Sequence, residues 1–203
     1  MLLNITPLIC YFDDFITIDE CNHIISLAEP EIAPSSVCGI SEDGSQIERI
    51  YVEGRTSQHT FIKQDHDDIV KSICLKICQF ANIHPGTTEP LQVVKYDVGQ
   101  EYKPHYDAWD LQKERQWIGK SGQRGLTALL YLNDVEEGGN TIFPKLDIEI
   151  DPRPGRIVFF QNIWLGNPHR HDQSLHGGAP VIAGTKWVAN LWFRERFWTP
   201  HVQ

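Results

Sequence analysis

The sequence predicts a mainly β protein with supporting helices at its N-terminal end. Two observations carry this prediction. In the first third of the chain, apolar residues recur with the helical period of 3.6, whereas from Pro90 onward the period changes to 2. Short β-branched or aromatic runs then alternate with Gly, Pro and Asn turns, which is typical of a sandwich, barrel or jelly roll. Because helices come first and strands follow, we expect one β core buttressed by N-terminal helices.

The first predicted helix begins after Thr17. Residues 17–20 read Thr-Ile-Asp-Glu, the pattern of a capping box in which Thr17 and Glu20 satisfy each other's backbone amides. Apolar side chains then follow at the spacing of an amphipathic helix, at Cys21, Ile24, Ile25 and Ala28. Pro30 is expected to end the helix.

A second helix is predicted to begin within residues 65–68, where aspartates suit the positive end of a helix, and to continue to Ala81. Between the two helices, residues 39–54 are polar and include Ser-Glu-Asp-Gly-Ser. Loops of this length are often functional, so we expect a long, mobile lid here.

The predicted strands cover residues 91–98, 125–132, 156–161 and 186–193. In the last run, period 2 divides the side chains between two faces. Trp187, Ala189, Leu191 and Phe193 share an apolar face that must be core. Lys186 and Trp192 share the other face, which is better suited to the wall of a pocket.

Length and composition limit the possible classes of protein. The chain has 203 residues, 27 acidic against 18 basic, and a net charge of −9, so nucleic acid is a poor default partner. No stretch reaches the 18 apolar residues of a membrane helix, and residues 1–15 lack the basic start of a signal peptide. Five cysteines without a CxxC motif suggest reduced thiols. We therefore expect no membrane partner, a cytoplasmic location and a single domain, with helical support and lid in residues 1–88 and the β core in residues 89–203.

One motif suggests metal chemistry. His105 and Asp107 lie at i and i+2, so a strand would present both on one face. His176, just before a Gly-Gly turn, is a candidate for the third ligand. Two histidines and one carboxylate with open positions form the facial triad of non-haem Fe(II) oxygenases, whereas a filled zinc site would need a further ligand. His169 and His171 are rivals to His176, and we expect both in an exposed loop.

Several longer stretches accompany the triad. They are residues 91–96 (LQVVKY), 99–107 (GQEYKPHYD), 127–144 (TALLYLNDVEEGGNTIFP), 174–181 (SLHGGAPV) and 184–187 (GTKW). In order and spacing, the chain from Arg55 to Trp192 resembles the prolyl 4-hydroxylase branch of the Fe(II)/2-oxoglutarate-dependent dioxygenases. The resemblance implies a double-stranded β-helix core, the jelly-roll or cupin-like fold.

The resemblance also implies roles for particular residues. His105, Asp107 and His176 match the iron ligands. Lys186 matches the lysine that pairs with the distal carboxylate of 2-oxoglutarate, and the hydroxyls of Tyr96 and Thr127 match groups that hold the same carboxylate. A buried carboxylate needs such a cation and such donors to offset its desolvation.

The activity implied is that of a procollagen-proline 4-dioxygenase-like enzyme. It would use Fe(II), dioxygen and 2-oxoglutarate, with ascorbate as a further ligand, to hydroxylate proline at C4 in a peptide or protein, while 2-oxoglutarate becomes succinate and CO2. Substrate contacts are implied for five residues: Arg55, Ser57, Glu89, Tyr102 and Trp192. Arg194 departs from the family, since some peptide prolyl hydroxylases have His there, and the lid is longer than usual.

Other interpretations stay open at this point. Within the oxygenases, a free amino acid or another side chain could replace peptidyl proline. The same three ligands could hold zinc in a hydrolase, although Tyr96, Thr127 and Lys186 would then have no purpose. The chain could also be a non-catalytic peptide-binding jelly roll, which the intact ligand set argues against. The oligomeric state is left open.

Overall fold

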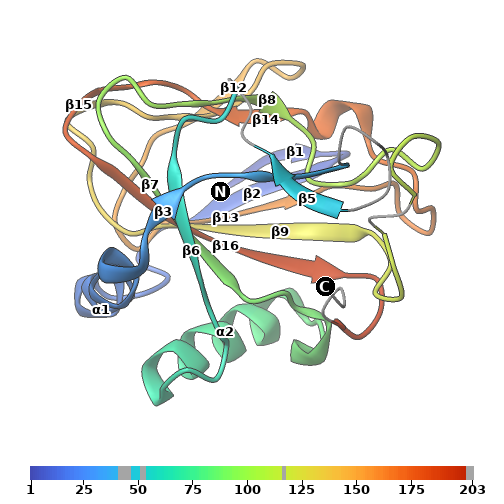
Figure 1. Cartoon of the computed structure of the whole chain (residues 1–203), viewed down its shortest axis with the longest axis horizontal. Helices are drawn as coiled ribbons and strands as arrows, with labels where there is room; N and C mark the ends of the chain where they lie inside the picture. The colour runs from blue at the N-terminus through green and yellow to red at the C-terminus, as the bar shows by residue number, and fades with distance from the viewer. Residues whose placement is uncertain (41–46, 51–53, 116–117, 200–203) are drawn as a thin grey trace.

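The computed structural model describes residues 1–40, 47–50, 54–115 and 118–199. The molecule has three layers (Figure 1): a small sheet, a large sheet beneath it, and two helices against the outer face of the large sheet. All strand pairs in both sheets are antiparallel. The two facing sheets form the predicted jelly-roll core.

The large sheet has eight strands in the order β1-β2-β13-β9-β16-β7-β6-β3. Their bounds are β1 (Leu2–Ile5), β2 (Leu8–Phe12), β3 (Ala33–Pro34), β6 (Gln58–Ile62), β7 (Leu91–Tyr96), β9 (Arg124–Tyr131), β13 (Ile157–Gln161) and β16 (Lys186–Arg194). The small sheet has the order β12-β11-β14-β8. Its strands are β8 (Tyr102–His105), β11 (Thr141–Phe143), β12 (Ile148–Ile150) and β14 (His176–Gly178). A separate pair joins β10 (Glu137–Gly138) to β15 (Val181–Ala183).

The two helices begin as the sequence predicts. Helix α1 (Ile18–Ala28) has both bonds of the capping box, because the Glu20 amide donates to the Thr17 hydroxyl and the Thr17 amide donates to the Glu20 carboxylate. Helix α2 (Asp68–Ala81) is capped by Asp67, whose carboxylate accepts from the amide of Val70 at 2.8 Å. Short 3₁₀ helices are η1 (Glu29–Glu31), η2 (Pro85–Thr87) and η4 (Asp172–Ser174).

Strand β16 shows why the pocket forms where it does. Its Trp187, Ala189, Leu191 and Phe193 belong to the core between the large sheet and the helices. The opposite face turns Lys186, Val188, Asn190 and Trp192 toward the space between the sheets, where all four line a pocket. The division into a core face and a pocket face that period 2 predicts is therefore confirmed.

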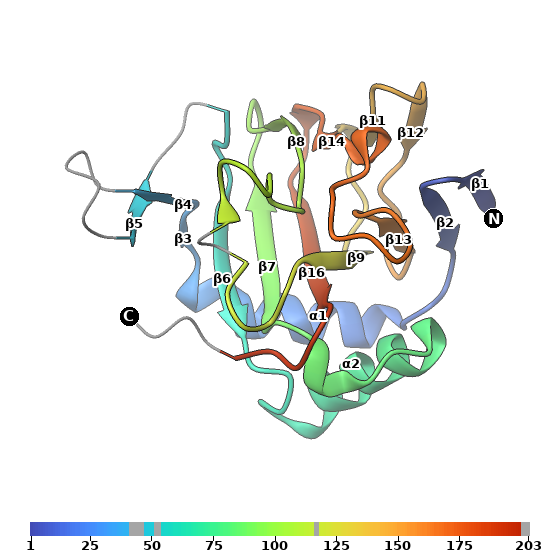
Figure 2. The same cartoon turned by 90° about the vertical axis from the view of Figure 1, so that its right-hand side faces the viewer.

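The N-terminal part of the chain differs from its prediction. Four strands of the large sheet, β1, β2, β3 and β6, lie within residues 1–88, so this part does more than supply helices and a lid. Strands β1 and β2 extend one edge of the sheet beside β13, and β6 extends the other side beside β7 (Figure 2). These strands are short, and the alternation in residues 2–12 is too brief to separate from a loop by period alone.

The predicted lid lies only partly within the described residues. Strands β4 (Val37–Ile40) and β5 (Ile47–Ile50) pair as an antiparallel ribbon where the sequence predicts a loop. Residues 41–46 and 51–53, which include most of the predicted mobile segment, lie outside the described residues. In the described part of the chain, no helix combines the length and the apolar character needed to cross a membrane.

Candidate active site

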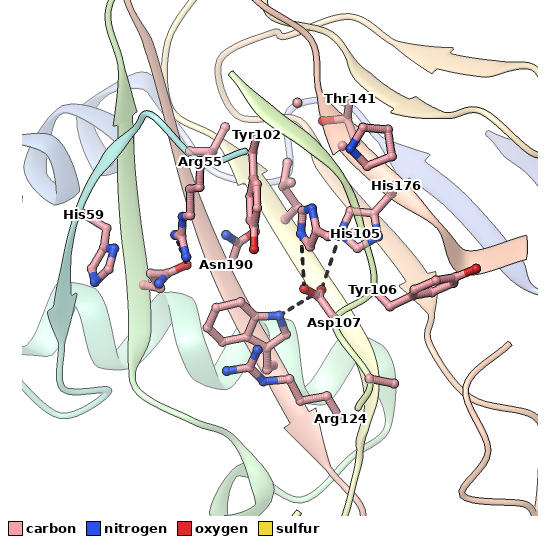
Figure 3. A pocket seen from close by; sticks show the side chains of 18 of the residues that line it. Arg55, His59, Tyr102, His105, Tyr106, Asp107, Arg124, Thr141, His176 and Asn190 are labelled. Atoms are coloured by element: carbon pink, nitrogen blue, oxygen red, sulfur yellow. Dashed lines mark hydrogen bonds and ion pairs between the residues drawn. The ribbon is translucent and has the colours of Figure 1, made fainter. Parts of the chain in front are cut away.

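The small sheet brings the three predicted metal ligands together. Strands β8 and β14 are antiparallel neighbours, and His105 at the end of β8 is the register partner of His176 at the start of β14. Asp107 follows β8 by two residues and turns toward both rings (Figure 3). One donor atom from each residue lies within 4.8 Å of the others. This spacing suits three ligands around one metal ion.

Both histidines present the same nitrogen to this point. Nδ1 of His105 lies 3.0 Å from the Lys103 carbonyl oxygen, and Nδ1 of His176 lies 2.9 Å from the Ser174 carbonyl oxygen. Because a carbonyl oxygen only accepts, each Nδ1 carries a proton, so Nε2 is the nitrogen that offers a lone pair in the neutral ring. The two Nε2 atoms each lie 3.7 Å from a carboxylate oxygen of Asp107. Backbone carbonyls therefore fix the tautomer that a metal requires.

Two donors fix the Asp107 carboxylate. The Thr127 hydroxyl donates to Oδ2 at 2.6 Å, and the indole Nε1 of Trp192 donates to the same oxygen at 2.9 Å. Burial alone would raise the pKa of Asp107, but the imidazoles of His176 and His105 outweigh that effect and lower it. Burial also lowers the pKa of His105. All of these shifts favour the deprotonated ligands that bind metal.

Lys186 lies in the same pocket as a buried cation. It is 2% exposed, and burial lowers its pKa to about 7. Its Nζ lies over the rings of Tyr96 and Tyr131, and a Cβ added to Gly178 would come within 3.6 Å of it and within 3.8 Å of the Tyr96 hydroxyl. Among the described residues, no carboxylate forms an ion pair with Lys186. A buried cation without a carboxylate partner in the described part of the chain suits an anionic ligand.

The prediction for Thr127 requires a correction. Its hydroxyl, 1% exposed, accepts from Asn162 at 2.8 Å and donates to Asp107, and it does not line the pocket. The Thr127 hydroxyl is therefore engaged by Asp107 and Asn162 and is not available to a carboxylate beside Lys186. The reason is the register of β9, which pairs Thr127 with Trp192 and places it near the end of β16 that is distant from Lys186.

Thr141, which the sequence interpretation did not single out, is linked to the surroundings of Lys186 through Tyr131, whose ring lies under the Lys186 Nζ and whose hydroxyl donates to Thr141. It pairs with Gly178 across β11 and β14, and it lines the pocket. Its Oγ1 lies 2.6 Å from the hydroxyl of Tyr131. The chain contains a signal for it, since Thr141 follows the Gly-Gly turn at 138–139, but only the pairing of the strands shows that this turn faces Lys186.

The predicted substrate residues divide into two groups. Arg55 and Tyr102 lie together on the pocket wall, with the guanidinium 4.7 Å from the centre of the ring, and the same ring stacks on His105 at 3.6 Å. Ser57 lies behind this wall, because it is buried, does not line the pocket, and has its hydroxyl 2.9 Å from that of Ser35. Trp192 lines the pocket, with Arg124 over its ring at 3.6 Å.

Glu89 lines the pocket, but its carboxylate is bound by two arginines. Arg124 forms two hydrogen bonds to its carboxylate, at 2.7 and 2.8 Å, and Arg194 adds a third at 2.9 Å. Burial alone would raise the pKa of Glu89, but the two guanidinium groups outweigh that effect and lower it. Arg194, the departure noted in the sequence, therefore fixes Glu89 and leaves this carboxylate little freedom to bind a substrate directly.

The rival histidines lie away from the cluster. His169 is exposed, as predicted, but His171 is buried, caps η4 through its Nδ1 and packs against the Trp164 ring at 3.8 Å. The three ligands, Lys186, Tyr96 and Thr141 instead line one pocket of about 740 Å³ between the sheets. A jelly roll with this donor set and a buried cation defines a class of protein, the metal-dependent oxygenases that take an anionic co-substrate.

Comparisons with known proteins specify the family. The profile of the 2OG-Fe(II) oxygenase superfamily matches residues 91–194. Probable prolyl 4-hydroxylase 8 of Arabidopsis thaliana is 36% identical in an alignment that covers 90% of this chain and 67% of the plant protein. Prolyl 4-hydroxylase 5 of the same plant is 34% identical, covering 92% and 68%. The chain belongs to the 2OG-Fe(II) oxygenase superfamily.

The solved structures agree with this assignment. The viral collagen prolyl hydroxylase of Paramecium Bursaria Chlorella virus-1, solved as a complex with 2OG, has a TM-score of 0.73 and 28% identity, covering 92% of this chain and 95% of the viral chain. The family implies Fe(II), 2-oxoglutarate and dioxygen. The residues present suit them, because two imidazoles and one carboxylate leave iron positions open and the buried Lys186 can receive a dicarboxylate.

Proposed function

We propose that this enzyme hydroxylates proline at C4 in a peptide or protein, with one 2-oxoglutarate converted to succinate and CO2 for each hydroxyl group formed. The observation that carries the proposal is the position of Lys186. A buried cation with no carboxylate partner among the described residues shares a pocket with the His105, Asp107 and His176 cluster. A zinc hydrolase would use the same three ligands but would leave this cation unexplained.

Each residue of the site has a role in this reaction. His105, Asp107 and His176 would hold the iron, with Thr127 and Trp192 keeping the Asp107 carboxylate in place. Lys186, Tyr96 and Thr141 would bind the distal carboxylate of 2-oxoglutarate. The bound iron and 2-oxo acid supply the oxidising chemistry, in which one atom of dioxygen enters succinate and the other enters the substrate. The protein excludes water and places the substrate.

The substrate part of the proposal rests on the wall of the pocket and on the relatives. Arg55, Tyr102 and Trp192 offer a cation and two aromatic surfaces beside the metal cluster. Aromatic walls suit a proline-rich segment in the extended polyproline II conformation. The named functions of the plant and viral relatives point to the same substrate class.

Succinate release in the presence of Fe(II), 2-oxoglutarate and proline-containing peptides tests the proposal. We expect one peptide to stimulate release and to gain one oxygen atom on proline by mass spectrometry, with 4-hydroxyproline recovered on hydrolysis. The same peptide with Ala in place of Pro is the matched control, and His176→Ala is expected to form no succinate. Oxygen on another residue, or faster turnover of free proline than of any peptide, would contradict the substrate assignment.

Two expectations from the sequence remain predictions. Ascorbate is not singled out by any residue of the pocket, and omission of ascorbate from the same assay tests whether turnover depends on it. The cytoplasmic location is likewise a prediction.

A further inference from the structure

The pocket is basic although the chain is acidic. Six of the 18 lysines and arginines line it, but only three of the 27 aspartates and glutamates do. The six are Arg55, Lys103, Arg124, Arg170, Lys186 and Arg194. Iron and 2-oxoglutarate carry opposite double charges, so their binding leaves this excess of positive charge unchanged. The site is therefore still positive when it meets its substrate.

Four of these six cations already have a carboxylate partner or an assigned one. Lys186 would receive 2-oxoglutarate under the proposed function, Arg124 and Arg194 share Glu89, and Arg170 lies 3.4 Å from Asp110. Lys103 is exposed to water. Arg55 remains, and it is the cation whose charge the substrate would meet.

Within the described residues, Arg55 contacts only neutral groups. It donates to the Ser57 hydroxyl, the Ser36 carbonyl and the Gln92 side-chain oxygen, each at 3.4 Å. None of the described carboxylates lies within ion-pair distance of it. Three long hydrogen bonds to neutral acceptors hold the side chain loosely, and its charge has no counterion in the part of the chain that the structure describes.

Arg55 lies close to His105 of the proposed iron site, where the substrate proline would be oxidised. Its guanidinium covers one face of Tyr102 at 4.7 Å, and Tyr102 stacks on His105 at 3.6 Å, so the guanidinium lies no further from the His105 ring than these two distances together (Figure 3). An extended peptide advances about 3.3–3.6 Å per residue. A side chain one or two positions from the oxidised residue can therefore reach Arg55.

We infer that the peptide substrate carries an aspartate or glutamate one or two positions from the hydroxylated proline, and that Arg55 binds this carboxylate. The inference rests on the proposed function and adds the charge of the sequence around the proline. A guanidinium offers a planar fork that pairs with a carboxylate through two parallel hydrogen bonds. An acidic peptide is repelled by the remainder of the chain but attracted to the pocket, so only its correct placement is favoured.

A matched peptide series tests the inference. Peptides of one sequence carry Glu, Gln or Lys at each position from −2 to +2 around a single proline, and succinate release gives KM and kcat for each. At one or more positions, we expect Glu to lower KM about tenfold relative to Gln, equivalent to ~1.4 kcal/mol, and Lys to raise it. The advantage of Glu should shrink as salt is added. Equal KM values for Glu and Gln at every position would overturn the inference.

Variants of Arg55 identify the partner. In the Arg55→Gln enzyme, the KM for the Gln peptide divided by the KM for the Glu peptide should be close to one. The Arg55→Glu enzyme should use the Lys peptide better than the Glu peptide. Arg153→Gln is the matched control, because Arg153 is exposed and outside the pocket, and it should keep the wild-type ratio. An unchanged ratio in Arg55→Gln, or a raised requirement for 2-oxoglutarate as its only change, would show that Arg55 does not bind the peptide.

Failure of this inference is distinguishable from failure of the proposed function. If no peptide in the series gains oxygen on proline, the proposed function fails. If the Gln peptides are hydroxylated as well as the Glu peptides, proline hydroxylation stands and the acidic preference alone is overturned. Thermal unfolding of each Arg55 variant, with its 2-oxoglutarate affinity, shows whether the pocket is still folded.

Discussion

Burial of Lys186 destabilises the ligand-free protein but favours the binding of an anion. Without a ligand, its burial destabilises the charged form and lowers its pKa to about 7. With a dicarboxylate beside it, the charged form becomes the favoured one. The residue thus reduces the stability of the ligand-free protein in return for affinity, as is common at functional sites.

Replacement of Lys186 by Met should therefore stabilise the ligand-free protein, most strongly below pH 7. Between pH 7 and about 10.5, the unfolded chain holds a proton on Lys186 that the folded chain releases, so wild-type stability rises with pH in this window. The gain from Lys186→Met is expected to be a few kcal/mol at pH 6 and clearly smaller at pH 9. Urea unfolding at both pH values measures it.

Lys71→Met, at an exposed position on α2, is the control for loss of a lysine. Its effect should be small at both pH values. A gain for Lys186→Met that is the same at pH 6 and pH 9 would show that the Lys186 side chain is not buried as a strained cation.

Thr127 and Thr141 should respond differently to loss of the hydroxyl. Thr127→Val removes a donor to Asp107 and is expected to weaken Mn(II) or Co(II) binding about tenfold, with little change in the 2-oxoglutarate requirement. Thr141→Val should raise the 2-oxoglutarate requirement several-fold and leave metal binding intact. Calorimetric metal titration and steady-state kinetics separate the two effects, with Thr→Ser at each position as the rescue. The opposite pattern would restore the original assignment of Thr127.

At the scale of secondary-structure elements, the site depends on which strands are neighbours. His105 and Asp107 could be predicted from the sequence as a pair because they are two residues apart, and His176 from its place before a Gly-Gly turn. The hydroxyl beside Lys186 could not be assigned correctly, because this requires knowing that β11 pairs with β14 while β9 pairs with β16. Local period gives the faces of a strand, but not its register against distant strands.

The capping box of α1 provides a prediction at the same scale. Thr17→Ala removes the side-chain oxygen that accepts from the Glu20 amide and should lower the free energy of unfolding by about 1 kcal/mol. Thr17→Ser keeps that oxygen and should retain most of the stability. Urea unfolding measures both variants, and 2-oxoglutarate turnover per folded molecule should be unchanged. Equal stability of the Ala and Ser variants would show that the cap contributes nothing.

At the scale of the whole molecule, the helices and the large sheet form a platform for the small sheet. The core between helices and sheet is apolar, with Ile24, Ile73, Leu130 and Leu191 among its buried members. The second core, between the sheets, gives way to the polar pocket where β8 ends and β14 begins. The mainly β class and the position of the helices could be predicted from period alone. The N-terminal strands could not, because strands as short as these carry little periodic signal.

The assembly of one Fe(II) and 2-oxoglutarate site from His105, Asp107, His176 and Lys186 is tested most directly by anaerobic titration. A 2-oxo acid chelated to Fe(II) gives a visible charge-transfer absorption, which needs no substrate. We expect saturable absorption with Fe(II) and 2-oxoglutarate in the wild type, none in His176→Ala, and full absorption at a much higher 2-oxoglutarate concentration in Lys186→Ala. Wild-type absorption in His176→Ala, or unchanged 2-oxoglutarate saturation in Lys186→Ala, would contradict the site described here.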